Sequence, residues 1–519
     1  MKPIILAILD GWGIGSENQT NAIYAARTPN ITKAEMLYPH CSLQSSAMAV
    51  GLPWKEAGNS EVGHLIIGSG RIIYQYLPRI SMDIENGDFF KNSAFLKTID
   101  HVKKFNSTLH LMGLISSGNV HSYLEHVYGL LELARQNNVE NLRLHLFTDG
   151  KDAPQKEGIK VISTLIEKLK NPNWKIASIV GRYYGMDRNH NWDRTEIAYN
   201  LITQGIGEKT QNPIETIKNY YQQDITDTYL GPMVTGSAGN VKDNDAIIFW
   251  DFREDSARQL TEAFVKKDFN KFKKTSIDNL LFCTMTEYEK DLGVEVAYPS
   301  IKIKNHLTEV LNSYQKRTLK VAETEKYAHI TYFFNGNKEE PHPNETRKLI
   351  ASKIVTHYDK FPEMQADKIT REIISGIENK FDLIVANYSN ADMIGHTGNL
   401  KSVIRAIEFI DKAIEPLIKS AAKGDCILII TADHGNAEQM INPQTGEPKT
   451  EHTLNPVPFY LIGKEFEMRK PASAKAPAGK YSFETPEGML SDIAPTILAL
   501  MQIPQPPEMT GESLLNILK

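Results

Sequence analysis

With 519 residues, the chain is longer than one hydrophobic core usually supports, so we expect two domains. Hydrophobic residues make up 41% and charged residues 23%, which excludes a mostly disordered or fibrous chain. The formal net charge of -5 indicates neither a nucleic-acid partner nor a membrane partner. Three scattered cysteines without CxxC spacing argue against a disulfide framework or a thiolate zinc site and favour a cytoplasmic protein: Cys41, Cys283 and Cys426.

Both ends of the chain show the pattern of a mainly parallel sheet. Residues 4–9 form an apolar run that predicts a buried strand, because the run is too short to cross a bilayer. Similar runs at residues 381–386 and 426–431 predict further central strands. Residues 345–354 and 403–422 have helical spacing, which gives the alternation of an α/β layered fold.

The middle of the chain repeats this α/β character but lacks the Asp and His pairs that follow the strands at the two ends. The simplest arrangement is one domain, residues 1–76 and 311–519, interrupted by an inserted second domain, residues 77–310. Two short linkers between them would permit hinge motion. Residues 471–480, rich in Ala, Lys and Pro, predict an exposed loop. The strands predicted in the middle of the chain are residues 109–112, 142–147, 175–180 and 246–250.

A set of Asp and His residues near the predicted strand ends could bind metal, because ligands gather at the carboxyl ends of strands in open α/β sheets. Carboxylate oxygens and neutral imidazole nitrogens together suit divalent ions such as manganese or zinc. Asp392 with His396 could equally form a loop salt bridge, and a lone His452 is more often a surface histidine. The pair Asp433 and His434 precedes Gly435, where a sharp turn would let adjacent ligands serve two ions. The candidate ligands are Asp10, Asp392, His396, Asp433, His434 and His452.

Ser60 lies in a glycine-flanked motif, Gly58-Asn59-Ser60-Glu61-Val62-Gly63-His64. One interpretation is a helix N-cap, since a helix could begin directly after Ser60. The other is a nucleophile for phosphoryl transfer, activated by metal coordination, with the helix N-terminus holding the incoming phosphate. The nearby candidate metal ligands favour the nucleophile.

The middle of the chain contains basic residues that could bind a small anionic substrate, because Arg pairs bidentately with phosphate and carboxylate groups. Charged helix faces are the common alternative. Lys151 and Asp152 follow a predicted strand and would place a cation beside a general base. His121 could add a further phosphate or hydroxyl contact. The basic candidates lie in two segments, Gly181 to Arg188, with Arg182 and Arg188, and Phe252 to Arg258, with Arg253 and Arg258.

Together these motifs resemble those of the cofactor-independent phosphoglycerate mutases of the alkaline-phosphatase superfamily, in the same order and over essentially the whole chain. The resemblance implies a phosphatase-like domain built from both chain ends, with a phosphotransferase domain inserted. The motifs that carry it are Asp10-Gly11-Trp12-Gly13, Gly58 to His64, Asp149-Gly150-Lys151-Asp152, Gly181 to Arg188, Glu323-Thr324-Glu325-Lys326-Tyr327, Asp392-Met393-Ile394-Gly395-His396 and Thr431 to Asn436.

The resemblance also implies a site and a reaction. A phosphate would pass from 3-phosphoglycerate to Ser60 and return to the 2-hydroxyl, with Asp152 shuttling protons and Lys326 stabilising negative charge. Two Mn²⁺ ions, no bisphosphoglycerate and a monomer are expected. One manganese would be held by Asp10, Ser60, Asp433 and His434, and the other by Asp392, His396 and His452. The substrate would be lined by His121, Lys151, Asp152, Arg182, Arg188, Arg253 and Lys326.

The substrate motifs depart from the family pattern, whereas the metal motifs do not. Lys151 and Ser256 stand where the family usually has Arg, and Ser117 and Asn119 replace an Asp and a Gly. A second hypothesis is therefore a phosphomonoesterase, or a mutase with altered substrate choice. A third is a metal-binding scaffold without catalysis, which the retention of Ser60 and of every candidate ligand argues against.

Overall fold

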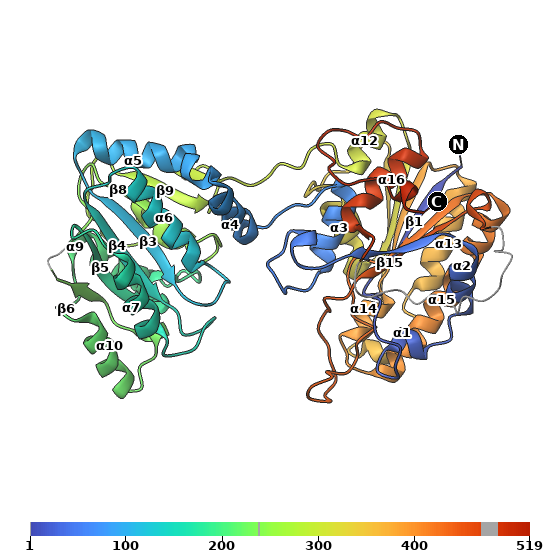
Figure 1. Cartoon of the computed structure of the whole chain (residues 1–519), viewed down its shortest axis with the longest axis horizontal. Helices are drawn as coiled ribbons and strands as arrows, with labels where there is room; N and C mark the ends of the chain where they lie inside the picture. The colour runs from blue at the N-terminus through green and yellow to red at the C-terminus, as the bar shows by residue number, and fades with distance from the viewer. Residues whose placement is uncertain (1, 237–238, 469–485, 519) are drawn as a thin grey trace. The chain divides into compact units, whose positions relative to one another are not determined.

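The computed structural model describes residues 2–236, 239–468 and 486–518. The chain forms two compact units (Figure 1). The first unit contains Met1–Gln75 and Lys302–Lys519, and the inserted unit contains Tyr76–Ile301. The α/β class and the interruption of one unit by another are confirmed. The predicted loop at residues 471–480 lies outside the described residues.

The first unit is built on a mainly parallel sheet of eight strands. Only the pairs β14 with β15 and β15 with β2 are antiparallel among its described strands. The strand order is β12 (Glu345–Ile350), β11 (Thr318–Glu323), β13 (Leu383–Tyr388), β1 (Ile4–Leu9), β14 (Ile427–Thr431), β15 (Val457–Ile462), β2 (His40–Gln44) and β16 (Gly488–Met489).

Helices cover both faces of this sheet, with α3 and α16 on one side and α13 and α15 on the other (Figure 1). No described helix of the chain is both long enough and apolar enough to cross a membrane. The helices of the first unit are α1 (Ala22–Ala25), α2 (Pro29–Leu37), α3 (Ser60–Ser69), α12 (Leu307–Ser313), α13 (Ala366–Glu378), α14 (Asn390–Gly395), α15 (Leu400–Lys423) and α16 (Ile493–Leu500).

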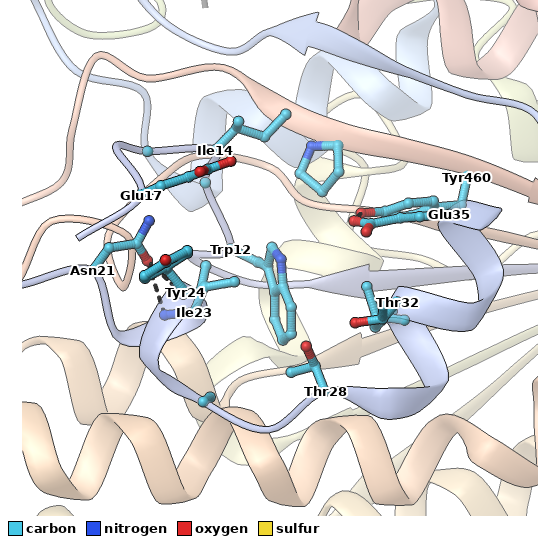
Figure 2. A pocket seen from close by; sticks show the side chains of 15 residues that line it. Trp12, Ile14, Glu17, Asn21, Ile23, Tyr24, Thr28, Thr32, Glu35 and Tyr460 are labelled. Carbon is cyan, nitrogen blue, oxygen red and sulfur yellow. Dashed lines mark hydrogen bonds between the residues drawn. The ribbon is translucent and has the colours of Figure 1, made fainter. Parts of the chain in front are cut away.

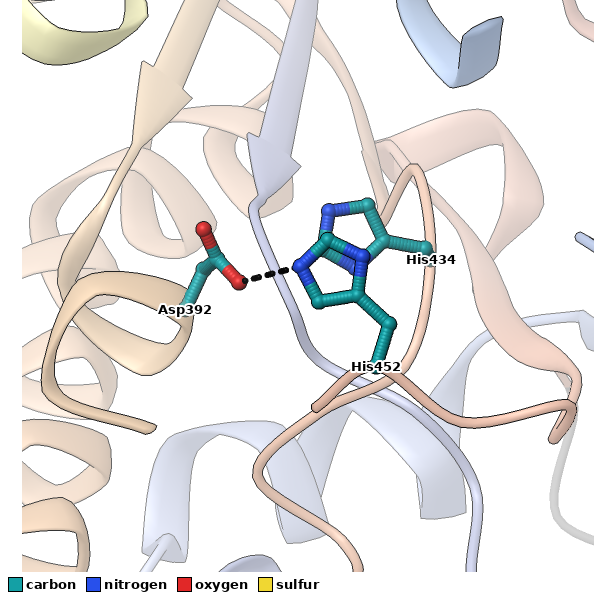
Figure 3. Close-up of side chains that lie close together, drawn as sticks. All are labelled: Asp392, His434 and His452. Carbon is teal, nitrogen blue, oxygen red and sulfur yellow. Dashed lines mark ion pairs between the residues drawn. The ribbon is translucent and has the colours of Figure 1, made fainter. Parts of the chain in front are cut away.

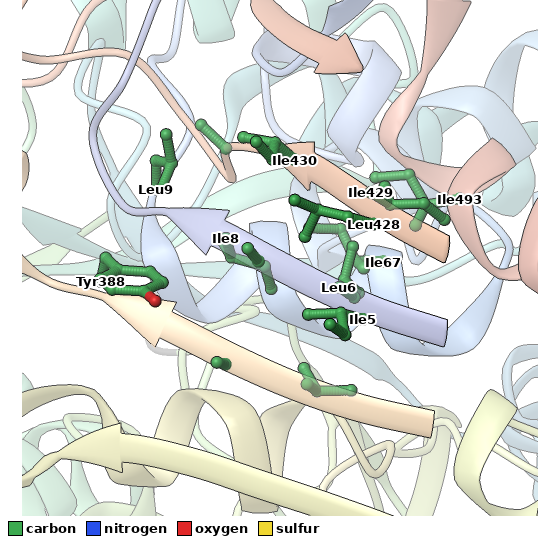
Figure 4. Packing of buried hydrophobic residues seen from close by; sticks show 14 of the residues in the cluster. Ile5, Leu6, Ile8, Leu9, Ile67, Tyr388, Leu428, Ile429, Ile430 and Ile493 are labelled. Carbon is green, nitrogen blue, oxygen red and sulfur yellow. The ribbon is translucent and has the colours of Figure 1, made fainter. Parts of the chain in front are cut away.

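The central strand β1 explains why this sheet forms. Its six residues are all buried, as expected for an apolar strand covered on both faces. β1 lies between β13 and β14 and pairs in parallel with both. Figure 4 shows its side chains in the core with those of the two neighbouring strands, Ile67 of α3 and Ile493 of α16. The three strands therefore run in the same direction through one core.

One prediction for the first unit is wrong. Residues 345–350 form the edge strand β12 rather than a helix, with side chains that are mostly partly buried or exposed. β12 pairs in parallel with β11, from Thr318 opposite Glu345 to Glu323 opposite Ile350. An edge strand needs no continuous apolar run, so its mixed charged and apolar residues were misread as helical spacing.

The inserted unit has a second eight-stranded sheet, parallel except where β5 meets β7. Separate clusters of buried apolar residues cover its two faces, one including residues of α5, α6 and α7 and the other residues of α9 and α11. All four strands predicted here are confirmed, as β3, β4, β5 and β8. The order is β10 (Glu295–Tyr298), β9 (Leu281–Thr286), β8 (Ala246–Phe249), β3 (Leu109–Ile115), β4 (Leu142–Thr148), β5 (Trp174–Gly181), β7 (Met233–Thr235) and β6 (Glu208–Thr210).

The helices of the inserted unit connect and cover these strands. In chain order they are α4 (Tyr76–Asn86), α5 (Ser93–Phe105), α6 (Leu124–Gln136), α7 (Gly158–Lys168), α8 (Arg182–Gly185), α9 (Trp192–Gln204), α10 (Pro213–Gln222) and α11 (Arg258–Val265). The four-residue helix α8 directly follows β5, so Arg182 begins at the carboxyl end of a sheet strand.

Helix α3 packs so closely on the loop after β14 that only glycine fits at position 63. A Cβ on Gly63 would lie 2.7 Å from the Asp433 carbonyl oxygen and 2.8 Å from its Cβ. We expect Gly63→Ala to destabilise the protein by about 1–2 kcal/mol. The clash is with backbone, so overpacking costs about 2–3 kcal/mol, the upper part of its usual range, and Ala gains only roughly 1 kcal/mol over Gly in a helix. Chemical denaturation measures this change.

The control is Glu61→Ala, an exposed position in the same helix. It should change the free energy of unfolding by no more than about 0.5 kcal/mol. A Gly63→Ala protein as stable as the parent chain would contradict the close packing.

Candidate functional site

The carboxyl ends of three neighbouring strands in the first unit carry the predicted carboxylates. Asp10 directly follows β1, Asp433 lies shortly after β14, and Asp392 lies in α14 after β13. Because β1 pairs in parallel with β13 and β14, these strand ends meet at one edge of the sheet. All three side chains are buried. The structure therefore brings the three carboxylates together.

Ser60 is directed into this cluster. It is the first residue of α3, and Asn59 is the N-cap, because the Asn59 side chain accepts a hydrogen bond from the Val62 N–H at 3.0 Å. The interpretation of Ser60 as the N-cap is therefore wrong. Its Oγ lies 3.2 Å from Asp10 Oδ1 and 3.0 Å from His434 Nε2. The hydroxyl is thus available for chemistry.

Lys326 joins the serine to two of the carboxylates. It lies in a helical turn, Thr324–Lys326, directly after β11. Its Nζ donates at 2.7 Å to each of Ser60 Oγ, Asp10 Oδ1 and Asp392 Oδ2. Burial alone lowers the pKa of Lys326, but Asp10 and Asp392 more than reverse this and raise it above its ordinary value. The ammonium is therefore charged at neutral pH.

The carboxylates differ in how their surroundings change their acidity. Burial, followed by the charge of Asp433, raises the pKa of Asp10. Burial also opposes ionisation of Asp392, but Lys326 lowers its pKa well below the usual value. For Asp433 the effect of burial is outweighed mainly by His434, so its pKa is lowered. Three buried carboxyl groups share one lysine, and such a surplus of acidic groups favours a further cation.

Three histidines lie around the carboxylates. The ring of His434 stacks on that of His452, with centroids 3.8 Å apart, beside the Asp392 carboxylate (Figure 3). His452 Nε2 lies 3.2 Å from Asp392 Oδ1 and 3.2 Å from His396 Nε2. The structure therefore brings together every metal-ligand candidate of the first unit.

Backbone carbonyls orient two of these rings. His396 Nδ1 lies 2.7 Å from the Thr450 oxygen, and His452 Nδ1 lies 2.8 Å from the Gly58 oxygen. Because a carbonyl only accepts, each Nδ1 carries a proton, and in the neutral ring each Nε2 then presents a lone pair. Both Nε2 atoms face the same point near Asp392. This is the tautomer that metal-binding histidines adopt when the outer nitrogen is hydrogen-bonded.

The donor set fits two divalent cations. Asp433 Oδ2 is buried and accepts no hydrogen bond, although the rings of His64 and His434 lie 3.2 and 3.5 Å away, so this oxygen can bind a cation. Oxygen and imidazole nitrogen donors suit manganese or zinc. Two groups of side chains each have ligand atoms within 4.8 Å of one another: Asp10, His64 and Asp433, and Asp392, His434 and His452.

His434 lies between these two groups. Its Nε2 is 3.5 Å from both Asp10 Oδ1 and Asp433 Oδ2. The family resemblance assigns it to the ion held by Asp10 and Asp433, whereas its stacking places it equally beside His452. The division of ligands between the two ions stays a prediction.

His64 is a site residue that the sequence analysis missed. Its Nδ1 lies 2.8 Å from the Ser60 carbonyl oxygen and 3.2 Å from Asp433 Oδ2. Its Nε2 lies 3.0 Å from Asn387 Nδ2, which also donates to Asp10 Oδ2 at 2.7 Å. The signal was present, because the i to i+4 spacing from Ser60 to His64 places both on one side of a helix.

Two of the pockets formed by the described residues lie in the first unit. One of about 850 Å³ opens beside His396 and His452 and gives access to the cluster. The other, of about 300 Å³, surrounds the Trp12 indole, which lies between Glu17 on one side and Glu35 on the other (Figure 2). The lining of this second pocket, all within the described residues, contains no Lys or Arg. It is therefore unsuited to an anionic substrate.

The basic candidates of the inserted unit gather at a pocket of about 480 Å³. Arg182 Nη1 donates to Asp149 Oδ1 at 2.6 Å and to Asp152 Oδ2 at 2.5 Å. Its Nη2 lies 3.0 Å from His121 Nε2. All six substrate-binding candidates of this unit line the pocket: His121, Lys151, Asp152, Arg182, Arg188 and Arg253.

The residues that depart from the family pattern have different surroundings. Ser256 lines the pocket and is buried, whereas Lys151 lines it from an exposed position. The Ser117 hydroxyl donates to Glu157 Oε2 at 2.8 Å, and an aspartate at this position would be repelled by Glu157. Nothing in the structure explains Asn119. Asp149 and Asp255 also pair with pocket arginines and were not predicted.

Comparison with known proteins matches both units to family models. Residues 80–290 match the model described as the BPG-independent PGAM N-terminus. Residues 293–444 match that of type I phosphodiesterases and nucleotide pyrophosphatases.

Whole proteins match over almost their full length. The chain is 45% identical to 2,3-bisphosphoglycerate-independent phosphoglycerate mutase 1 of Methanosarcina barkeri, covering 99% of this chain and 98% of that protein. It is 44% identical to the mutase of Clostridium acetobutylicum, covering 99% of each. A crystal structure of Leishmania mexicana phosphoglycerate mutase at low cobalt concentration has a TM-score of 0.55 and 28% identity, covering 98% of this chain and 97% of that one. The chain therefore belongs to the family of 2,3-bisphosphoglycerate-independent phosphoglycerate mutases.

Proposed function

We propose that this protein interconverts 3-phosphoglycerate and 2-phosphoglycerate through a phosphoserine at Ser60, in glycolysis and gluconeogenesis, in the cytoplasm and without bisphosphoglycerate. The observation that carries the proposal is the position of Ser60 Oγ, within 2.7–3.2 Å of Lys326, His434 and Asp10. A hydroxyl with an ammonium and a carboxylate this close is arranged for nucleophilic attack on an anionic group.

The first unit would hold two divalent cations, which we propose to be Mn²⁺. When bound, they would neutralise phosphate oxygens and favour ionisation of the serine hydroxyl. One would be held by Asp10, Ser60, Asp433 and His434, and the other by Asp392, His396 and His452.

In the first half-reaction, Ser60 Oγ attacks the phosphorus of 3-phosphoglycerate, and the bond from phosphorus to the glycerate 3-oxygen breaks. Asp10 Oδ1 accepts the hydrogen bond of the serine hydroxyl and aligns it. The hydroxyl proton is lost to solvent when the serine ionises before attack, so Ser60 enters and leaves each reaction cycle as the alkoxide. The Lys326 ammonium donates to the same oxygen and stabilises the negative charge that develops around it. Asp152 delivers a proton to the departing glycerate oxygen.

In the second half-reaction, glycerate stays in the pocket of the inserted unit and turns. Its 2-hydroxyl gives a proton to Asp152 and attacks the phosphoserine, which restores Ser60. Arg182 holds Asp152 at 2.5 Å and so keeps the carboxylate in place for both transfers. One oxygen–phosphorus bond forms and one breaks in each half, so no water is consumed.

A phosphomonoesterase, or a mutase with altered substrate choice, is the second candidate, and the observation that favours it is Ser256. A buried serine lines the pocket where family members have an arginine. If glycerate is held less firmly, water can intercept the phosphoserine, and phosphate is released. Lys151 keeps a positive charge but cannot pair bidentately.

Replacing the nucleophile tests the first candidate. Ser60→Ala should abolish isomerisation in a cofactor-free assay with Mn²⁺, because the residue that takes the phosphate is gone. The product is identified by the position of its phosphate. Ser69→Ala, at the other end of α3, is the matched control and should keep its activity. An active Ser60→Ala protein would refute the phosphoserine mechanism.

Removing the shared ammonium tests how charge is stabilised. Lys326→Met should lower kcat by about 10²–10³, as loss of one preorganised donor to developing negative charge does in other enzymes. Circular dichroism should show a folded protein. The control is Lys33→Met, at an exposed lysine of α2, which should keep the parent activity. A kcat within a factor of two of the parent chain would contradict the role of Lys326.

The two candidates differ in what Ser256→Arg does. If the chain is partly a phosphatase, the parent protein should release phosphate at a rate comparable to isomerisation. Ser256→Arg should then raise the ratio of isomerisation to phosphate release by about tenfold or more, since one charge-assisted hydrogen bond contributes about 1.5–3 kcal/mol. Ser256→Gln adds bulk without charge and should leave the ratio unchanged. Negligible phosphate release by the parent chain would eliminate the second candidate.

A further inference from the structure

Asp255 lies at the pocket of the inserted unit and has no role in the reaction proposed above. It sits between the pocket residues Arg253 and Ser256, and its carboxylate is partly exposed. Its two oxygens have different partners. Guanidinium groups bind one oxygen, and a serine hydroxyl binds the other.

Oxygen Oδ2 of Asp255 occupies the fork between two arginines. Arg188 Nη1 donates to it at 2.5 Å. Arg253 Nε donates to it at 3.1 Å, and Arg253 Nη2 lies 3.1 Å away. Three guanidinium nitrogens from two side chains therefore converge on one carboxylate oxygen. This is the arrangement that an oxygen of a bound carboxylate or phosphate would have.

Oxygen Oδ1 of Asp255 faces a second set of donors. The Ser256 hydroxyl donates to it at 3.2 Å. His121 Nδ1 lies 3.7 Å away, which is too far for a hydrogen bond. A modest movement of the carboxylate toward His121 would close this distance.

The His121 N–H is a donor without a partner. Since Arg182 can only donate, its contact with His121 Nε2 at 3.0 Å makes Nε2 the acceptor and leaves the proton on Nδ1. Burial and the nearby Arg182 charge lower the pKa of His121 to about 4, so the ring is neutral at pH 7. His121 Nδ1 is nevertheless buried with no hydrogen-bond partner. A buried unpaired donor is costly, so a partner that moves to it gains stability.

Arg182, another arginine of the pocket, does not share this arrangement. Arg182 is largely buried and pairs with both Asp149 and Asp152. The Arg188 and Arg253 side chains are each 46% exposed. Ion pairs of such exposed groups contribute little stability, so a substrate anion can replace Asp255 at low cost.

We propose that Asp255 is an internal counter-anion that occupies the Arg188 and Arg253 fork in the substrate-free protein and moves to His121 Nδ1 when an anionic group of the substrate enters. The proposal rests on the proposed function, since it takes phosphoglycerate as the ligand. Asp255 thereby competes with the substrate and keeps the two guanidinium groups correctly placed between turnovers. An anion must therefore bind the two guanidinium groups more strongly than the Asp255 carboxylate does in order to displace it.

The test measures binding without turnover. In the full-length, Mn²⁺-loaded chain carrying Ser60→Ala, the Kd for 3-phosphoglycerate is measured by calorimetry with and without Asp255→Asn. The amide cannot compete as an anion, so Asp255→Asn should bind about fivefold more tightly. The gain should shrink as NaCl rises, because competition between charges is screened. A role in local packing alone would show no such salt dependence.

Two controls separate this effect from charge and from structure. Asp224→Asn removes one negative charge from an exposed ion pair with Lys156 and should leave the Kd unchanged. Asp255→Glu keeps the charge and should not tighten binding. Unchanged or weaker binding by Asp255→Asn, in a parent chain that isomerises phosphoglycerate, overturns this inference and leaves the proposed function intact. Failure of both chains to bind 3-phosphoglycerate overturns the substrate assignment and this inference together.

Discussion

Buried carboxyl groups at adjacent strand ends of the first unit must be balanced by positive charge, and the arrangement of its candidate site depends on this constraint. Parallel pairing of β1 with β13 and β14 brings Asp10, Asp392 and Asp433 to one edge of the sheet. Lys326 reaches two of them and the Ser60 hydroxyl at 2.7 Å. Buried charges are tolerated only when paired, so the remaining carboxylate oxygen and the oriented histidines prepare the unit to take cations.

In the inserted unit, carboxylates of the chain balance positively charged side chains instead. Its pocket gathers guanidinium groups, and carboxylates of the chain pair with them. Arg182 is largely buried between Asp149 and Asp152, which suits the proposed role of holding Asp152 in place for proton transfer. Arg188 and Arg253 are half exposed and both pair with Asp255, which suits the proposed exchange of one anion for another.

The two departures Lys151 and Ser256 have unequal consequences for this pocket. Lys151 is exposed and keeps its charge, so its replacement of arginine alters geometry more than electrostatics. Ser256 is buried and removes a charge, but its hydroxyl donates to Asp255 Oδ1. The serine therefore takes part in positioning the internal carboxylate.

The sequence by itself determined the α/β class, the central strands and the gathering of Asp and His at strand ends, because apolar runs followed by polar residues reflect burial directly. It misread residues 345–350, since an exposed edge strand lacks an apolar run and is recognised only through its pairing with β11. It favoured Ser60 as a nucleophile over a helix cap, and the position of the Asn59 side chain in the structure shows that Asn59 is the cap. Asn387 and Asp255 needed the tertiary structure, because their contacts with Asp10 and Arg188 join residues far apart in the chain.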